Sequence, residues 1–439
     1  MAPPAPSAPS LSSLFPEHSY GPVPVVILDG GMGTSLEAPP FSLSLDSDLW
    51  SSELLGSPRG RETLERLHQT WIGESGAQVV ETCTYQSSLP LFLPREDPCT
   101  PSQTSSALSL MTSALPLLTS FTRSPSSAPS DERPLAALSL GPFGAALQPG
   151  QEYGGLYPPP FGPASPPAKP SPSRLAAGDR ACAAAGPLPL ELFAPSAVEA
   201  ANEEDHLAAW HLQRLEHFAT SPAAFAALGL LAFETVPNLY EARAIRRAVA
   251  AFRARGGPER QTPFYLSFVL PLTAGDGDAQ PHVKLPDASL SHLSLAEQAP
   301  AILASALGPL AHGEEAARPD GIGFNCTSPL RAAEVVEALS SALAASASAS
   351  RQSSASTPWL VLYPDGGAVY DVHTRSWSHP LGLSDSRWAT VVADAVAVAR
   401  EGHAVWGGVI AGGCCKAGFG AIRALREECE ARGWTRRRA

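Results

Sequence analysis

The chain has 439 residues, of which 44% are hydrophobic, and its formal net charge is −12. A chain of this length can bury a large core, and the lack of lysine runs interleaved with aromatic residues disfavours a nucleic-acid partner. The N-terminal residues lack a basic segment followed by an apolar one, and no run of about 18 apolar residues occurs. We therefore expect no secretory leader and no membrane-spanning helix.

The seven cysteines are scattered along the chain without the density of a disulfide-rich scaffold. This usage predicts reduced thiols and a cytoplasmic protein. We expect a monomer or a small homo-oligomer.

Eight short apolar runs rich in β-branched residues recur along the chain, each closed by glycine, proline or a small polar residue. Helical patterns lie between them, including 206–219, 239–254, 330–345 and 388–402. Apolar strands that alternate with helices predict a parallel sheet covered on both sides, and eight units favour a closed (β/α)8 TIM barrel over an open sheet. The strands are expected at 23–29, 77–83, 135–141, 230–235, 263–269, 321–326, 359–364 and 406–412.

Three segments of biased composition interrupt this alternation, near 98–132, 157–190 and 340–358. They are rich in Ser, Pro and Ala and look too poor in apolar residues to pack. We predict one barrel domain over 21–430 that carries them as surface insertions or mobile loops. A disordered tail over 1–20 is expected before the domain, and a basic tail over 431–439 after it.

Cysteines lie at two predicted strand ends, where the loops of such a barrel build the active site. Cys326 ends the sixth strand, and Cys414 and Cys415 follow the eighth behind two glycines. Because one strand separates the two ends, the three thiols are expected to converge, and three thiolates suit zinc. The glycines would let the backbone turn so that both neighbouring thiols face one ion.

The residues alone leave other interpretations open. Adjacent cysteines are often small buried residues, and Cys83 near the mouth would close the zinc site as a fourth thiolate and make it structural. Asp29 and Glu234, at two other strand ends, would bind a cationic group, cap a helix or form a surface salt bridge. Thr82 and Tyr85 would shape the pocket or simply pack.

Seven stretches, spread in order over nearly the whole chain, resemble the homocysteine S-methyltransferases, a family of zinc enzymes with a homocysteine-binding barrel. Each stretch is weak evidence alone, but together they are specific. They are ILDGGMGTSLE (27–37), ETCTYQSS (81–88), SLGPFGAAL with EYGGLY (139–157), FETVPNLYEA (233–242), GIGFNCTSP (321–329), LVLYPDGGAVYD (360–371) and GGCC (412–415).

The resemblance implies a zinc ion held by Cys326, Cys414 and Cys415, with the sulfur of homocysteine as the fourth ligand. The ion would keep this sulfur as a thiolate, which would take a methyl group from S-methylmethionine or S-adenosylmethionine and form methionine. Asp29 and Glu234 match the acidic residues with which the family holds the amino acid. Glu234 is expected to pair with the substrate ammonium.

The chain departs from the family pattern in two loops. Lys416 stands where the family has arginine after GGCC, and YPDGGA, which includes Asp365, replaces the family's YPNSGE. These changes spare the three cysteines and bear on the choice of donor. Betaine as donor or selenocysteine as acceptor is the nearest enzymatic alternative. A barrel with structural zinc that binds sulfur amino acids without catalysis is the alternative of another class.

Overall fold

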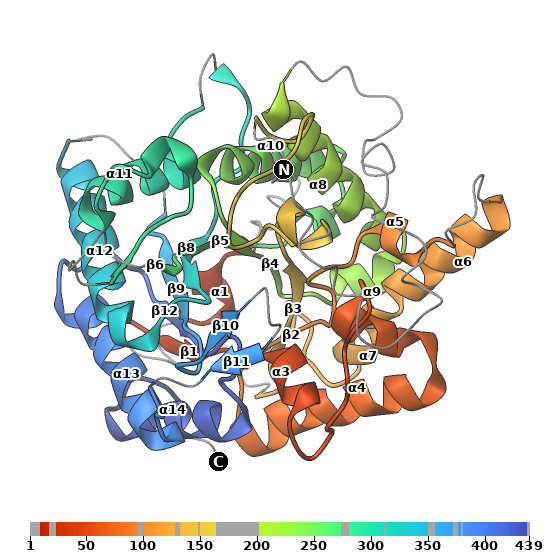
Figure 1. The fold of residues 1–439 in the computed structure, drawn as a ribbon, viewed down its shortest axis with the longest axis horizontal. Coiled ribbons are helices and arrows are strands. Elements are labelled where there is room, and N and C mark those ends of the chain that lie inside the picture. The colour runs from red at the N-terminus through yellow and green to blue at the C-terminus, as the bar shows by residue number, and fades with distance from the viewer. Residues whose placement is uncertain are drawn as a thin grey trace, which may run out of the picture.

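The computed structural model describes residues 9–16, 23–94, 100–127, 132–147, 150–163, 202–273, 281–310, 313–349, 356–371, 376–378 and 381–436. At its centre is an eight-stranded parallel sheet with the strand order β1-β12-β9-β8-β5-β4-β3-β2. A bridge between Leu28 and Val79 joins its two end strands, so the sheet closes into a barrel. Helices surround this barrel (Figure 1), and the predicted (β/α)8 fold is confirmed.

The eight strands begin and end within three residues of their predicted bounds. They are β1 (Val25–Ile27), β2 (Val79–Glu81), β3 (Leu135–Leu140), β4 (Leu230–Val236), β5 (Phe264–Val269), β8 (Gly321–Asn325), β9 (Trp359–Tyr363) and β12 (Val409–Ala411). The loops after β5 and β9 each contain a short two-stranded hairpin. They are β6 (Leu272–Thr273) with β7 (His282–Val283), and β10 (Val369–Asp371) with β11 (Ser376–Ser378).

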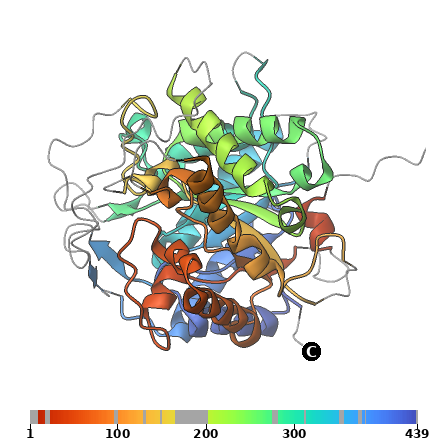
Figure 2. The ribbon, with the colours of Figure 1, turned by 90° about the vertical axis from the view of Figure 1, so that its right-hand side faces the viewer.

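A helix of the outer ring follows each barrel strand. The ring consists of α4 (Pro58–Thr70), α7 (Ala114–Thr119), α8 (Glu203–Ala219), α10 (Leu239–Ala254), α11 (Leu295–Leu307), α12 (Ala332–Ala349), α13 (Asp385–Glu401) and α14 (Phe419–Ala431). Further helices lie in the connecting loops: α3 (Met32–Glu37), α5 (Leu89–Phe92), α6 (Pro101–Thr112) and α9 (Pro222–Ala226). In Figure 2 the helices between β1 and β3, in orange, cover the side that faces the viewer.

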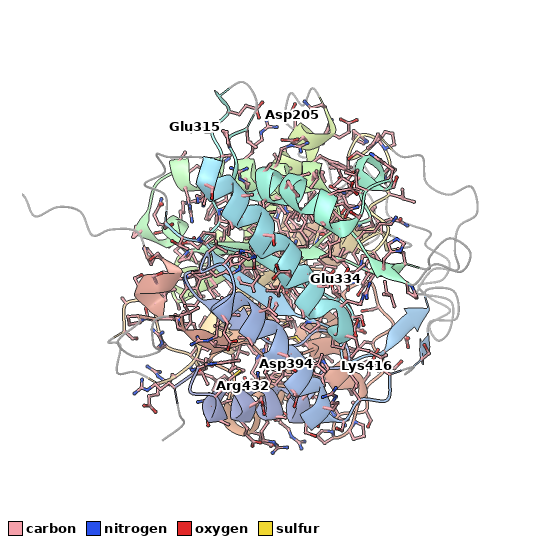
Figure 3. All side chains as sticks on the ribbon, turned by 90° about the vertical axis from the view of Figure 1, so that its left-hand side faces the viewer. Asp205, Glu315, Glu334, Asp394, Lys416 and Arg432 are labelled. Atoms are coloured by element: carbon pink, nitrogen blue, oxygen red, sulfur yellow. A yellow bond between two sulfur atoms is a disulfide. The ribbon has the colours of Figure 1, made fainter. Side chains whose placement is uncertain are left out.

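Neighbouring helices of the ring contact one another at their exposed edges. Arg432, just after α14, donates a 2.9 Å hydrogen bond to Asp394 of α13, and both side chains are labelled in Figure 3. None of the helices in the described part of the chain has the length and apolar character needed to cross a bilayer.

Successive strand residues alternate between two cores. Val25 and Ile27 of β1 point outward to the helices, whereas Val26 and Leu28 point into the barrel. The interior is filled by large side chains such as Trp359, so the barrel is packed and is no pore. The inward positions at the carboxyl ends of the strands are the ones left to carry polar groups.

The N-terminal segment differs from the disordered tail that the sequence predicted. Within it, Leu11–Leu14 form α1, and Leu11, Leu14 and Phe15 are buried inside the barrel. Phe15 packs on Trp359, the first residue of β9, with ring centroids 5.8 Å apart. The helix therefore closes the barrel at the amino ends of its strands. Burial of three large apolar side chains outweighs the Pro/Ser-rich composition around them.

Two of the three segments that the sequence predicted as surface insertions or mobile loops contain helices. The first contains α6 and α7, in which Met111, Leu115 and Leu118 are fully buried, so this segment has enough apolar residues to pack. The third overlaps α12, which continues to Ala349. The second lies mostly outside the described residues, although Tyr157 at its start is fully buried.

The residues that follow α14 also pack on the barrel, where the sequence predicted a separate basic tail. The Trp434 carbonyl accepts a hydrogen bond from the Val25 N–H at 3.1 Å, at the first residue of β1. Thr435 is buried, and its hydroxyl is hydrogen-bonded to Gln78 at 3.1 Å. Residues 437–439 lie outside the described part.

Candidate active site

A cavity of about 300 Å³ opens at the carboxyl ends of the barrel strands, where active sites of this fold lie. The predicted site residues on its wall are Thr82, Tyr85, Glu234, Cys326, Cys414 and Cys415. Asp29 lies behind this wall, with 1% of its surface exposed. Other lining residues received no role from the sequence, among them Trp50, Glu81, Ser139, Glu152, Tyr153 and Tyr363.

The three predicted cysteine ligands converge on one side of the cavity. The Sγ atoms of Cys326, Cys414 and Cys415 all lie within 4.8 Å of one another. They come from the ends of β8 and β12, which flank β9 as the sequence predicted. Among the described residues, Cys83 is no part of this group. It is 1% exposed, and burial raises the pKa of its thiol to about 12.

The loop after β12 turns at a different residue from the glycines that the sequence predicted. The expected flexible glycines instead allow close packing: a Cβ on Gly412 would lie 2.7 Å from the Asp29 carbonyl oxygen. The turn itself is at Lys416, whose φ of 64° is left-handed. It is closed by a 3.0 Å hydrogen bond from the Ala417 N–H to the Cys414 carbonyl. Cys415 sits within this turn, and both neighbouring thiols thereby reach the cavity.

Cys326 and Cys414 are joined by a disulfide, whereas Cys415 is a free thiol. The expectation of reduced thiols is therefore wrong for this pair in the structure. A disulfide sulfur carries no negative charge, so these atoms can act as thiolate ligands only after reduction. Burial raises the pKa of the Cys415 thiol to about 12, which keeps it protonated unless a cation binds.

Strained backbone shapes the wall between β4 and β8. Thr235 has a φ of 60° and Cys326 one of 48°, a left-handed conformation that is rare for residues other than glycine. The Asn325 side chain links them, because its Oδ1 accepts the Thr235 N–H and its Nδ2 donates to the Thr235 hydroxyl, both at 2.8 Å. A register shift in β4 lets Glu234 and Thr235, although consecutive, both line the cavity.

Three carboxyl groups lie together at the inner end of the cavity. Burial raises the pKa of Asp29 and of Glu234 well above the usual range, and the neighbouring Glu81 raises both further. Burial raises the pKa of Glu81 itself to about 7. Ser139 donates a hydrogen bond to Glu234 Oε1, and Tyr265 donates one to Glu81 Oε1 at 2.8 Å. These contacts fix the carboxyl groups in place.

Thr82 and Tyr85 are held by contacts with neighbouring residues. The Thr82 hydroxyl accepts the Ser139 N–H at 3.1 Å and is hydrogen-bonded to the Thr84 hydroxyl at 2.6 Å. The Tyr85 ring meets the edge of Trp50 with centroids 6.3 Å apart. Tyr153 also lines the cavity and is hydrogen-bonded to Cys415. The aromatic residues therefore enclose the space next to the cysteines.

The two departures from the family pattern have local partners. The Lys416 N–H donates to the Thr34 hydroxyl at 2.8 Å, and its ammonium lies 3.8 Å from Glu37. Asp365 accepts the Gly367 N–H at 2.7 Å, an Asx turn that orders the loop after β9. Both residues thus have partners in the loops around the cavity, and the cysteine group is in place beside them.

The sequence model of the homocysteine S-methyltransferase family matches residues 26–429. The chain belongs to this family. It is a methyltransferase, as the seven stretches predicted. Homocysteine S-methyltransferase 2 of Zea mays is 24% identical over 407 residues, which cover 91% of this chain and 88% of the maize protein. Homocysteine S-methyltransferase YbgG of Bacillus subtilis is 25% identical over 402 residues, covering 91% and 93%.

The fold has a counterpart among solved structures. The homocysteine methyltransferase MmuM from Escherichia coli, in an oxidised form, matches with a TM-score of 0.52 and 19% identity. The match covers 92% of this chain and 96% of MmuM. It supports the barrel architecture.

Proposed function

We propose that this protein transfers a methyl group from a sulfonium donor, S-methylmethionine or S-adenosylmethionine, to the sulfur of homocysteine, with zinc as its cofactor. One observation carries the proposal. The Sγ atoms of Cys326, Cys414 and Cys415 lie within 4.8 Å of one another on the wall of a cavity that also holds buried carboxyl groups. Membership in the family supports the reaction class.

The reduced cysteines fit a zinc site. Sulfur ligands favour this ion, and three of them leave a fourth position for a substrate sulfur. When bound there, zinc would lower the pKa of the homocysteine thiol and supply a thiolate at neutral pH. Since Cys326 and Cys414 form a disulfide, we expect the protein to need a reductant before it binds the ion.

The carboxyl end of β4 would hold the amino acid. Glu234 is 5% exposed and faces the cavity, with its orientation set by the Ser139 hydroxyl. A buried carboxylate of this kind attracts an ammonium group strongly, because little water competes for it. Asp29, behind the wall, would support the same charge. Thr82 and Tyr85 would shape the space for the substrate chain.

The transfer itself requires orientation more than proton transfer. The homocysteine sulfur forms a bond to the donor methyl carbon as the bond from that carbon to the sulfonium sulfur breaks. The donor leaves as a neutral thioether, and the thiol proton passes to solvent. No group has to protonate the leaving sulfur, so Tyr85, Trp50 and Tyr153 contribute by holding the two sulfur centres in line and excluding water.

The proposal is tested by incubating reduced, zinc-loaded protein with homocysteine and one donor at a time. Methionine should form with S-methylmethionine or S-adenosylmethionine, and Cys415→Ser protein should form none above background. Absence of methionine with either donor would contradict the proposal. Parallel reactions with betaine, and with selenocysteine as acceptor, test the two alternative methyltransferases.

Zinc X-ray absorption separates the enzyme from a barrel with structural zinc. For the enzyme, the sulfur count around zinc should rise when homocysteine is added. For structural zinc, four protein sulfurs should already surround the ion without it. The position of Cys83 outside the cysteine group favours the first outcome.

A further inference from the structure

Glu81 is the last residue of β2 and faces the inside of the barrel. Val79, two residues earlier, belongs to the interior core, so the alternation of the strand turns Glu81 to the same side. Its carboxyl group accepts a 2.8 Å hydrogen bond from Tyr265 of β5. Two strands, β3 and β4, separate β2 from β5, so this contact spans the barrel. Glu81 therefore forms part of the floor of the cavity.

The three carboxyl groups of the floor differ in their access to the cavity. Glu81 and Glu234 are on its wall, whereas Asp29 is 1% exposed and lies behind them. The Oδ2 of Asp29 accepts the Glu81 main-chain N–H at 2.9 Å. Asp29 thus holds the end of β2 in position, and Glu81 is the carboxylate that this arrangement presents to a ligand.

Among the described residues, no lysine or arginine forms an ion pair with the carboxyl groups of the floor, although the buried Arg214 guanidinium acts electrostatically on Glu234. Within the described residues, the ion pairs of the chain do not involve Asp29, Glu81 or Glu234. The Oδ1 atom of Asp29 is buried and has no hydrogen-bond partner among the described groups. Buried carboxylates without a cation are costly, and each therefore favours a ligand that brings positive charge and donors.

We propose that Glu81, together with Glu234, contacts the ammonium group of the amino-acid substrate, and that Asp29 is a positioning residue for Glu81. An ammonium group has three donors and can bond to both carboxylates at once. This assignment rests on the proposed function, because it takes homocysteine as the substrate. It adds a specificity determinant at the end of β2, where sequence analysis had assigned recognition to Asp29 and Glu234.

The experiment compares two thiols that differ in the ammonium group. Binding of homocysteine and of 4-mercaptobutyrate, which lacks the amine, is measured by calorimetry on reduced, zinc-loaded protein without donor. Glu81→Gln keeps an acceptor for Tyr265 and removes the charge. It should weaken homocysteine binding by about tenfold or more, the range for loss of one partner of a buried charge pair, and 4-mercaptobutyrate binding by less than about twofold.

Two further variants identify the cause of any change. Tyr265→Phe removes the 2.8 Å hydrogen bond but keeps the Glu81 charge, and it should weaken homocysteine binding only about threefold. Glu334→Gln alters a surface carboxylate that lies 3.0 Å from the Arg331 guanidinium and does not line the cavity, and it should leave both affinities unchanged. Zinc content and urea midpoint report whether each variant is folded.

Equal weakening of both thiols by Glu81→Gln, or no weakening of either, would overturn the assignment while the proposed function stands. Wild-type protein that binds neither thiol would instead refute the proposed function, and the assignment with it. Selective loss of homocysteine binding supports the assignment.

Discussion

The Arg214 guanidinium donates a 2.6 Å hydrogen bond from Nη2 to the main-chain carbonyl of Tyr85. The same side chain, on α8, also donates to the carbonyls of Thr84, Ser87 and Gly141 at 3.0, 2.6 and 2.7 Å. Arg214 is 3% exposed, and burial lowers the pKa of its guanidinium to about 9. One buried cation therefore ties together the loops after β2 and β3, both of which line the cavity.

Replacing Arg214 with lysine should destabilise the protein by about 3 kcal/mol, because one ammonium cannot reach four carbonyls and leaves buried acceptors unpaired. Urea unfolding measures this loss. Arg255→Lys is the matched control, since Arg255 is 53% exposed and its side chain pairs with Glu216 at the surface. The control should change stability by less than about 0.5 kcal/mol. Equal free energies of unfolding for the two variants would contradict the inference that Arg214 holds these two loops together.

Zinc content should depend on the three converging cysteines and on their redox state. Reduced wild-type protein and Cys83→Ser protein should bind zinc in near-equimolar amount, because Cys83 lies outside the cysteine group. Cys414→Ser protein should lose most of its zinc, and so should wild-type protein kept oxidised, in which Cys326 and Cys414 share a disulfide. Metal analysis after desalting reports all four samples. Zinc retained by the oxidised sample would refute the ligand assignment.

Phe15→Ala should destabilise the barrel although Phe15 lies at the amino ends of the strands, opposite the cavity. The Phe15 ring is 1% exposed and packs on Trp359 inside the barrel. Large-to-small changes at such positions cost about 3–5 kcal/mol. Ser13→Ala, on the exposed side of α1, is the control and should cost at most about 1 kcal/mol, because it removes only the hydroxyl that accepts the Ser10 N–H at 2.8 Å in the capping box. Thermal or urea unfolding distinguishes the two.

The stability of the apo protein should fall as pH rises through the titration of the cavity floor. Burial raises the pKa of Glu81 from 4.5 to about 7. A carboxyl group with a raised pKa binds more protons in the folded state, so its stabilising effect is complete below pH 4.5 and is lost as pH rises to about 7. Asp29 and Glu234 shift in the same direction. Glu81→Gln should flatten this decline, measured as the free energy of unfolding between pH 5 and about 7.5.

The barrel could be predicted because its strands are continuous apolar runs, which the sequence displays directly. The helices that were missed have weaker signals. Thr100 and Gln103 form a capping box around a proline at the first helical turn of α6, a motif that would have predicted this helix. The short α1 also has a capping box, of Ser10 and Ser13, but a serine at the third helical position is a weaker sequence signal than glutamine. Its stability comes from the barrel interior that surrounds Leu11 and Leu14.

The sequence predicts the site residues whose chemistry follows from their residue type. It does not predict those whose role depends on how the strands pack. Cysteines at two predicted strand ends indicated that their sulfur atoms converge, and the structure brings these atoms together. Glu81 closes an apolar strand, and nothing in the sequence shows that Tyr265 lies across the barrel from it. Asn325 likewise gains its role only from the left-handed backbone of Thr235 beside it.

The left-handed bends at Thr235 and Cys326 also have an evolutionary consequence. Such conformations cost on the order of 1–3 kcal/mol each and persist only where the surroundings enforce them. Variants selected for heat tolerance alone would be expected to relax the Thr235 bend, for instance through glycine, and so loosen the pocket wall next to Glu234. Threonine at this position therefore holds the pocket wall in a defined shape at a cost to the stability of the fold.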